Sequence, residues 1–272
     1  MKIFNWNCNG YFKEDLPCIV NKSSEIHVDA DIYVIQECEN PDDPEFEEYR
    51  NYIIKHIGDN YFWTGDLPDR GLGIFAKDGI TLEKIKTKGN FKHFLALRVE
   101  DSFNLLGVWA MDEDKKLGLS PYVEMIHDFF DANKDLFDEN LIMCGDFNSS
   151  AVFNERHTYK YAHKDKYGKS KHHDNLNCKL NCKGLYSVYH KLTGEKSGEE
   201  TQFTFFQARH LNKPFHLDYV YANGKLIDKT VLREFGKSYD KDLLYCFRIL
   251  DFRKWIELSD HLPLVFKFDK FL

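Results

Sequence analysis

The sequence lacks the apolar segments that carry a chain into or across a membrane. No run approaches the roughly 20 apolar residues that span a bilayer, and the first residues, Met1 to Asn7, turn polar too soon for a secretory signal. The number of cysteines is odd, so they cannot all pair in disulfides within the chain. The seven cysteines are scattered, which argues against a disulfide framework and for reduced thiols. We therefore expect a soluble, cytoplasmic protein with no membrane contact.

No repeat or linker divides the 272 residues, so we expect a single domain, 1–272. Its hydrophobic fraction of 43% and charged fraction of 30% are those of a globular protein with a sizeable core. The 23 Phe and 15 Tyr favour packed sheet faces over a helical bundle. Nothing indicates an obligate protein partner, and we expect a monomer of the α/β (α+β) class.

Basic residues are fewer than acidic ones, 37 against 44, which gives a formal net charge of −7. Spread evenly, this charge would repel a polyanion. One segment differs: residues 150–185 are rich in lysine and histidine and show no clear period, which predicts a long surface excursion. Lys164 and Lys166 are candidate phosphate contacts there. A solvated loop with no substrate is the alternative.

Apolar and β-branched runs predict strands along the chain, and helical spacing predicts helices at Pro17 to Val28 and Pro121 to Phe137. The predicted strands are Lys2 to Cys8, Asp31 to Gln36, Tyr61 to Thr64, Leu72 to Ala76, Phe94 to Val99, Phe103 to Trp109, Leu141 to Cys144, Thr201 to Gln207, Phe215 to Tyr221, Leu226 to Arg233, Cys246 to Leu250 and Leu264 to Phe268.

At five places a polar residue stands at the end of an apolar strand, where a sheet can hold it rigidly. Taken singly, each has an ordinary explanation as a turn cap or a surface charge. Together they supply what phosphodiester hydrolysis needs: oxygen ligands for a hard cation, an acid or base, and neutral donors for the phosphorus oxygens. The residues are Asn7, Glu37, Asp146 with Asn148, His216 with Asp218, and Asp260 with His261.

These positions lie within five motifs, which resemble in order and spacing the signatures of the endonuclease/exonuclease/phosphatase superfamily, closest to its bacterial exonuclease and abasic-site endonuclease branch. The resemblance implies a four-layer α/β/β/α sandwich of two mostly antiparallel sheets flanked by helices, with the site at one end of the sheets. The motifs are Trp6-Asn7-Cys8-Asn9-Gly10, Ile35-Gln36-Glu37, Gly145-Asp146-Phe147-Asn148, His216-Leu217-Asp218-Tyr219 and Ser259-Asp260-His261-Leu262-Pro263.

The resemblance implies that Mg²⁺, or Mn²⁺ in its place, binds at Glu37 as the principal ligand. Asn7 and Asp260 would complete the metal shell, partly through water.

It also assigns proton transfer. His261 would act as general base or phosphate-stabilising imidazole, with Asp218 oriented against its other ring nitrogen. Asp146 would activate water or protonate the leaving oxygen, and Asn148 would hold a nonbridging oxygen. Whether His261 or Asp146 deprotonates water stays open at this stage.

Two positions depart from the family pattern. Trp109 stands where the abasic-site branch has a functional tyrosine, and a tryptophan offers only an N–H donor and a stacking face. His216 stands where the nucleases often have arginine, which suggests a different phosphate contact. Phe205 is predicted near the cleft, where it either stacks on a base or only packs on the sheet.

Three functions compete. The leading hypothesis is a Mg²⁺-dependent nuclease acting on DNA or RNA. A phosphatase or phosphodiesterase acting on a small or lipid phosphate is the alternative, favoured by the acidic net charge. An inactive binding module with the same fold is disfavoured, because every acid, amide and imidazole needed for hydrolysis is present.

Overall fold

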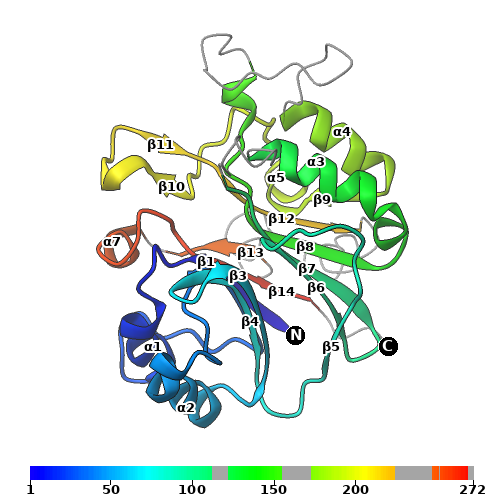
Figure 1. The fold of residues 1–272 in the computed structure, drawn as a ribbon. Helices are drawn as coiled ribbons and strands as arrows, with labels where there is room; N and C mark the ends of the chain where they lie inside the picture. Colours follow the sequence, from blue (N-terminus) through cyan, green and yellow to red (C-terminus); the bar gives the residue numbers. More distant parts are fainter. Residues whose placement is uncertain (112–121, 155–172, 224–246, 251, 269–272) are drawn as a thin grey trace, which may run out of the picture.

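Two six-stranded sheets carry the fold (Figure 1). The structure is a computed structural model that describes residues 1–111, 122–154, 173–223, 247–250 and 252–268. The first sheet has the order β13-β14-β1-β2-β4-β3 and the second β5-β6-β7-β8-β12-β9. The strands of the first sheet are β1 Lys2–Asn7, β2 Ile32–Cys38, β3 Asn60–Leu67, β4 Arg70–Ala76, β13 Phe247–Ile249 and β14 Leu264–Lys267. Those of the second are β5 Leu82–Lys84, β6 Phe94–Val99, β7 Phe103–Trp109, β8 Leu141–Asp146, β9 Leu185–Ser187 and β12 Asp218–Asn223. A small two-stranded sheet pairs β10 Phe205–Phe206 with β11 Pro214–Phe215.

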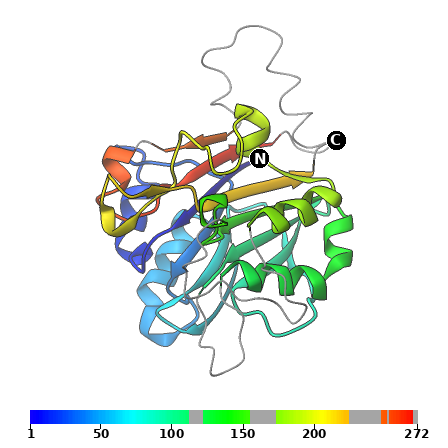
Figure 2. The same cartoon turned by 90° about the horizontal axis from the view of Figure 1, so that it is seen from above.

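Helices cover the outer face of each sheet. Figure 1 shows α1 and α2 on one side of the sandwich and α3 and α4 on the other, and Figure 2 shows the green helices lying over the second sheet. The helices are α1 Phe12–Val20, α2 Glu47–His56, α3 Val123–Ala132, α4 His173–Cys182, α5 Val188–Thr193 and α7 Phe252–Trp255, with short 3-10 turns η1 Pro44–Phe46, η3 Lys134–Asp138, η4 Ala151–Phe153 and η5 Gln207–Arg209.

Three hydrophobic clusters separate four layers. One cluster, with Val34, Leu105 and Val220, lies between the two sheets. A second cluster lies between the second sheet and helices α3 and α4, and a third lies between the first sheet and helices α1 and α2. Three buried interfaces require four layers. The predicted α/β/β/α sandwich is therefore confirmed.

Each sheet has one parallel pair at its centre and antiparallel pairs on both sides. The parallel pairs are β1 with β2 and β7 with β8. All other neighbouring strands in the two sheets are antiparallel. Carboxyl ends of parallel neighbours meet at one edge, so each sheet brings two strand ends together.

The first helix differs from its prediction. It spans Phe12–Val20 rather than Pro17 to Val28, because Phe12, Leu16 and Ile19 form its buried face at helical spacing. The predicted strand from Thr201 to Gln207 is reduced to β10, Phe205–Phe206. Side chains there bond the backbone locally, as when Glu195 accepts from the N–H of Thr201, and such bonds compete with a strand ladder.

The segment 150–185 contains regular structure at both ends. It begins with η4 and includes α4, whose Leu176 and Leu180 are buried against the second sheet. Lys164 and Lys166 lie outside the described residues, as does the strand predicted at Leu226 to Arg233. Among the described helices none is long and apolar enough to cross a membrane.

Candidate active site

The site lies where strand ends of both sheets meet. Asn7 ends β1 and pairs with Gln36 of β2, while Asp146 ends β8 and pairs with Trp109 of β7. Asp218 begins β12 directly opposite Asp146. Strand β14, preceded by the His261 segment, runs antiparallel to β1. The topology therefore gathers side chains that are far apart in the sequence.

A bulge at Glu37 turns its side chain toward Asn7. The register of β2 against β4 breaks between Gln36 and Cys38, and Glu37 between them has φ of +64°. A non-glycine residue in the left-handed region is strained, and such strain clusters at functional sites. The side-chain amide of Asn7 donates to Oε1 of Glu37 at 3.0 Å. The bulge thus supplies a carboxylate that the regular strand would have aimed elsewhere.

Asp146 is fully buried, and three hydrogen bonds hold its carboxylate. The backbone N–H of Asn148 donates to Oδ1 at 2.8 Å, and the side-chain amides of Asn148 and Asn7 donate to Oδ2 at 2.9 and 3.0 Å. The preceding residue must be glycine, because a Cβ on Gly145 would lie 1.8 Å from the carbonyl oxygen of Val108. Asn7 therefore joins Asp146 to Glu37, one carboxylate from each sheet.

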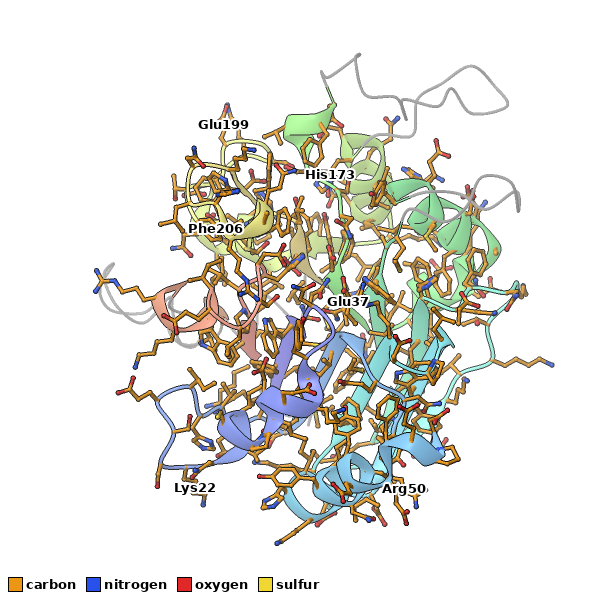
Figure 3. The ribbon with its side chains drawn as sticks, turned by 60° about the vertical axis from the view of Figure 1, so that its left-hand side comes forward. Lys22, Glu37, Arg50, His173, Glu199 and Phe206 are labelled. Carbon is orange, nitrogen blue, oxygen red and sulfur yellow. The ribbon has the colours of Figure 1, made fainter. Side chains whose placement is uncertain are left out.

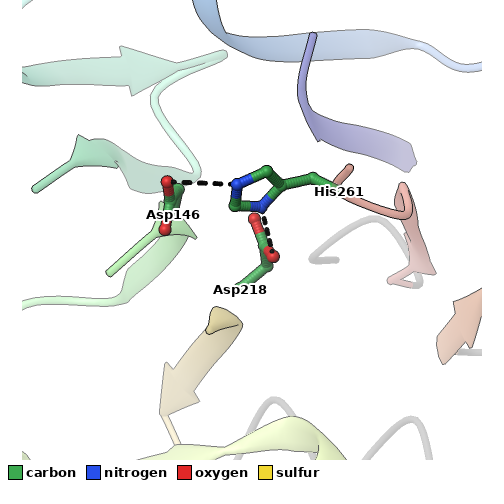
Figure 4. A group of neighbouring side chains, drawn as sticks. All are labelled: Asp146, Asp218 and His261. Carbon is green, nitrogen blue, oxygen red and sulfur yellow. Dashed lines mark hydrogen bonds and ion pairs between the residues drawn. The ribbon is translucent and has the colours of Figure 1, made fainter. Parts of the chain in front are cut away.

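His261 lies between two carboxylates (Figure 4). Its Nδ1 is 2.9 Å from Oδ2 of Asp218, a hydrogen bond, and its Nε2 is 3.8 Å from Oδ2 of Asp146. The segment that carries it is fixed by Ser259, whose hydroxyl donates to the carbonyl of Asn7 at 2.8 Å and accepts from the N–H of His261 at 3.1 Å. The imidazole therefore has a set orientation.

Burial and charge set the protonation of this group. Burial raises the pKa of Asp146 above its ordinary value, although the neighbouring imidazole opposes the rise. Burial lowers the pKa of His261, but the carboxylates of Asp218 and Asp146 outweigh it and raise that pKa well above 6.5. At neutral pH the imidazole is therefore charged, and Asp146 takes up a proton more readily than an ordinary aspartate.

The donor set of the site suits a hard cation. Glu37 and Asp146 present carboxylate oxygens on the two sides of Asn7, and hard divalent cations prefer oxygen ligands. Asp146, Asp218 and His261 also offer ligand atoms within 4.8 Å of one another. Because Nδ1 of His261 is already hydrogen-bonded to Asp218, we assign that second group to proton transfer rather than to a metal.

Solved structures with a similar architecture include an exonuclease, a 3′ phosphatase and an AP endonuclease. A 3′-5′ exonuclease (NExo) from Neisseria meningitidis has a TM-score of 0.60 and 16% sequence identity, with 99% of this chain and 100% of that chain covered. A structure of the 3′ phosphatase NExo from Neisseria, bound to product DNA hairpin, has a TM-score of 0.62 and 15% identity, with 99% of both chains covered. An AP endonuclease from Archaeoglobus fulgidus has a TM-score of 0.61 and 18% identity, again with 99% of both chains covered. The protein has the endonuclease/exonuclease/phosphatase fold. No family model matches the chain, and no curated protein matches it.

Within the endonuclease/exonuclease/phosphatase fold, the structure brings together Asn7, Glu37, Asp146, Asn148, Asp218 and His261. Figure 3 places Glu37 where the blue strands of the first sheet meet the green strands of the second. The side-chain amide of Asn148 donates its hydrogen bonds to other groups of the protein. Nδ2 donates to Asp146 and, at 2.8 Å, to the carbonyl of Ala110. In this arrangement Asn148 orients Asp146. Similarly, Asn7 turns Nδ2 to the carboxylates, and its Oδ1 accepts from the N–H of Asn9.

Three other candidates are placed differently around this group. Trp109 is 2% exposed and packs against His93, so its ring face is not open to a substrate. Phe205 is half-buried, with its ring centroid 4.6 Å from that of His261, at the edge of the site. Asp260 is adjacent through the backbone, but among described residues its side chain makes no hydrogen bond.

His216 is not brought into the site. Its ring is buried among Tyr189, Tyr219 and His190, and its Nδ1 lies 2.9 Å from the carbonyl of Gln202. Burial lowers the pKa of His216, which keeps the ring neutral. A ring that is 2% exposed in this cluster is not open to an anion in the cleft. Its placement indicates a packing role beneath β12.

His173 belongs to the same buried cluster and gives a pH-dependent prediction. Its ring packs on Tyr219 and bonds Ser149 at 3.0 Å, and burial lowers its pKa from 6.5 to about 3. The unfolded chain therefore binds a proton below pH 6.5 that the folded chain refuses, so stability is lost as the pH falls. We expect this group to lower the free energy of unfolding by about 2 kcal/mol between pH 7 and pH 5.

The measurement is urea unfolding at both pH values. His173→Gln should lose less stability on acidification than the wild type, while the exposed His56→Gln should follow the wild type. Equal pH dependence in His173→Gln and wild type would contradict the assignment.

Two supporting residues are not singled out by the sequence. The hydroxyl of Thr204 accepts from the N–H groups of Leu217 and Asp218 at 2.9 and 3.0 Å, and so fixes the start of β12. Arg70 lies 3.5 Å from Glu37. Thr204 stands in a loop with no motif. Arg70 opens an apolar strand, where a positive residue gives no signal of its own.

Proposed function

We propose that the protein is a divalent-metal-dependent phosphoesterase that hydrolyses the phosphodiester backbone of DNA or RNA. The observation that carries the proposal is the His261 imidazole held between Asp218 and Asp146, with Asn7 linking Asp146 to Glu37. The names of the structural neighbours, a 3′-5′ exonuclease, a 3′ phosphatase bound to product DNA hairpin and an AP endonuclease, support this reaction class.

Proton transfer is assigned to the buried pair. Asp146, whose pKa is raised by burial, accepts the proton of the attacking water. His261, whose pKa is raised by its two carboxylate neighbours, stabilises the charge that grows on the phosphorus oxygens. Asp218 orients the imidazole through Nδ1. Asn148 keeps the Asp146 carboxylate in place.

The metal is assigned to the Glu37 side of the site. Glu37 would hold Mg²⁺ or Mn²⁺, with Asp260 completing the shell. Asn7 would join the shell through Oδ1, the oxygen that here accepts from the N–H of Asn9. A bound cation supplies positive charge that neutralises the phosphate during attack. The side chain of Glu37 is 17% exposed, so a cation and a substrate can reach it.

The test is hydrolysis with Mg²⁺ or Mn²⁺ on single-stranded, double-stranded and abasic-site DNA, on RNA, and on inositol and lipid phosphates. Cleavage of nucleic acid is expected. Glu37→Gln should raise the Mg²⁺ concentration needed for half-maximal rate by at least about 10-fold, the loss typical of removing even a residue that supports a metal ligand, whereas the exposed Glu48→Gln should not. Turnover of inositol or lipid phosphates without any nucleic acid, or no turnover at all, would reject the proposal in favour of the small-phosphate enzyme or the inactive module.

A further inference from the structure

The candidate active site is strongly acidic, yet its proposed substrate is a polyanion. Glu37, Asp146 and Asp218 all present carboxylates to it. Among the described residues, Arg70 is the one lysine or arginine whose charged group lies within ion-pair distance of any of them, with Nη1 3.5 Å from Oε2 of Glu37. Its side chain is 47% exposed. An accessible cation therefore stands at the rim of the site.

Among the residues that the structure describes, Arg70 has one charged partner, Glu37. A charge-assisted hydrogen bond joins atoms at about 2.7–2.9 Å, so the 3.5 Å contact with Glu37 is an ion pair rather than a fork of hydrogen bonds. In the part of the chain that the structure describes, the guanidinium makes no hydrogen bond. Arginine carries five N–H donors in a planar fork that matches two phosphate oxygens.

The hairpin that carries Arg70 is fixed to its surroundings. Arg70 opens β4 and pairs across the turn with Leu67 of β3. The N–H of Asn40 donates to the carbonyl of Pro68 in the turn at 2.7 Å, and the indole of Trp63 donates to the carbonyl of Cys38 at 3.1 Å. Both anchors lie just after Glu37 on the chain. The backbone positions of Arg70 and Glu37 are therefore fixed relative to each other, which favours a preorganised contact.

Gly10 leaves room for the guanidinium. It has φ of +81°, and a Cβ there would lie 3.0 Å from Nη2 of Arg70. Gly10 follows β1, the strand that ends in Asn7. Arg70 thus lies between the loop after β1 and the bulge of β2, the two segments that supply Asn7 and Glu37.

We propose that Arg70 is a phosphate-binding residue that holds one backbone phosphate of the nucleic acid beside Glu37. This inference rests on the proposed function and adds a positioning residue to it. A purely structural role is the alternative: Arg70 would only neutralise Glu37. Loss of Arg70 alone does not separate the two, because it also leaves Glu37 unpaired.

A double variant separates them. Glu37→Gln with Arg70→Gln has the same net charge as the wild type but lacks the guanidinium. Binding of a fluorescein-labelled DNA duplex is measured in EDTA over a range of NaCl concentrations, so that neither metal nor turnover contributes. The slope of log Kobs against log[NaCl] is negative, and each lost phosphate contact reduces its magnitude by about 0.9.

We expect the magnitude of this slope to be about 0.9 smaller in the double variant than in the wild type. Arg70→Lys should keep the slope. Arg98→Gln serves as the matched control, because Arg98 also pairs with a glutamate, Glu139, at 2.8 Å. Arg98 lies on β6 near the end farther from Asp146. The Arg98→Gln variant should therefore have the same slope as the wild type. Thermal unfolding of each variant verifies the fold.

The outcomes distinguish the two hypotheses. Equal slopes in the wild type and the double variant overturn the role of Arg70 and leave the proposed nuclease intact. A wild type that binds the duplex with no salt dependence, or not at all, overturns duplex DNA as the substrate and the role of Arg70 with it.

Discussion

Replacement of His261 by alanine should lower kcat by about 10³- to 10⁴-fold. The imidazole is the group that reaches both Asp218 and Asp146, and its charged form is the one the two carboxylates favour. Without it the anion that forms at phosphorus loses the positive charge of the imidazole, and Asp218 has no partner to orient. The measurement is steady-state hydrolysis of a labelled oligonucleotide with saturating Mg²⁺.

Two controls make this result specific. His56→Ala removes an exposed histidine of α2, on the outer face of the sandwich, and should leave kcat unchanged. Added imidazole should restore part of the activity of His261→Ala, since the deleted ring leaves a space beside Asp218. A folded His261→Ala variant with a rate within tenfold of the wild type would remove His261 from the reaction.

Asp146→Asn is the second large effect, with an expected loss of about 10³-fold in kcat. The substitution keeps the size of the side chain but removes the base. It also disturbs a filled set of bonds: Asp146 accepts from three N–H donors, whereas an asparagine side chain offers one oxygen and two donors of its own.

Binding and catalysis should separate in this variant. Since Asp146→Asn removes a negative charge, the Kd for a DNA duplex in EDTA should stay equal or fall, while kcat drops. The exposed Asp138→Asn is the control, because it also loses one carboxylate but lies on η3, before the start of β8, whereas Asp146 ends that strand. A parallel loss of binding and rate would point to misfolding or to a substrate-holding role, and would contradict the assignment of Asp146 as base.

The sequence predicts the site residues better than their contacts. Asn7, Glu37, Asp146 and Asp218 stand at or beside the ends of apolar strands, a pattern that period and composition reveal. The side-chain directions do not follow from that pattern. His216 lies two residues before Asp218, yet its ring turns into a buried cluster, because Tyr189 and Gln202 from other segments pack against it.

Long-range contacts also hide the supporting residues. Thr204 fixes β12 through bonds to residues 13 and 14 positions away. Glu37 depends on a bulge, and bulges come from the pairing of two strands rather than from either strand alone. The helix at Phe12–Val20 could be predicted from the sequence, because its buried positions follow helical spacing.

The bond network from Glu37 through Asn7 to Asp146 crosses from one sheet to the other. In a chain whose two sheets have formed but have not yet packed together, Asn7 could bond Glu37 of the same sheet but not Asp146 of the other sheet. During refolding, recovery of hydrolysis would consequently report the docking of the sheets, later than any signal from backbone structure. The proposed catalytic site is complete only where the two sheets meet.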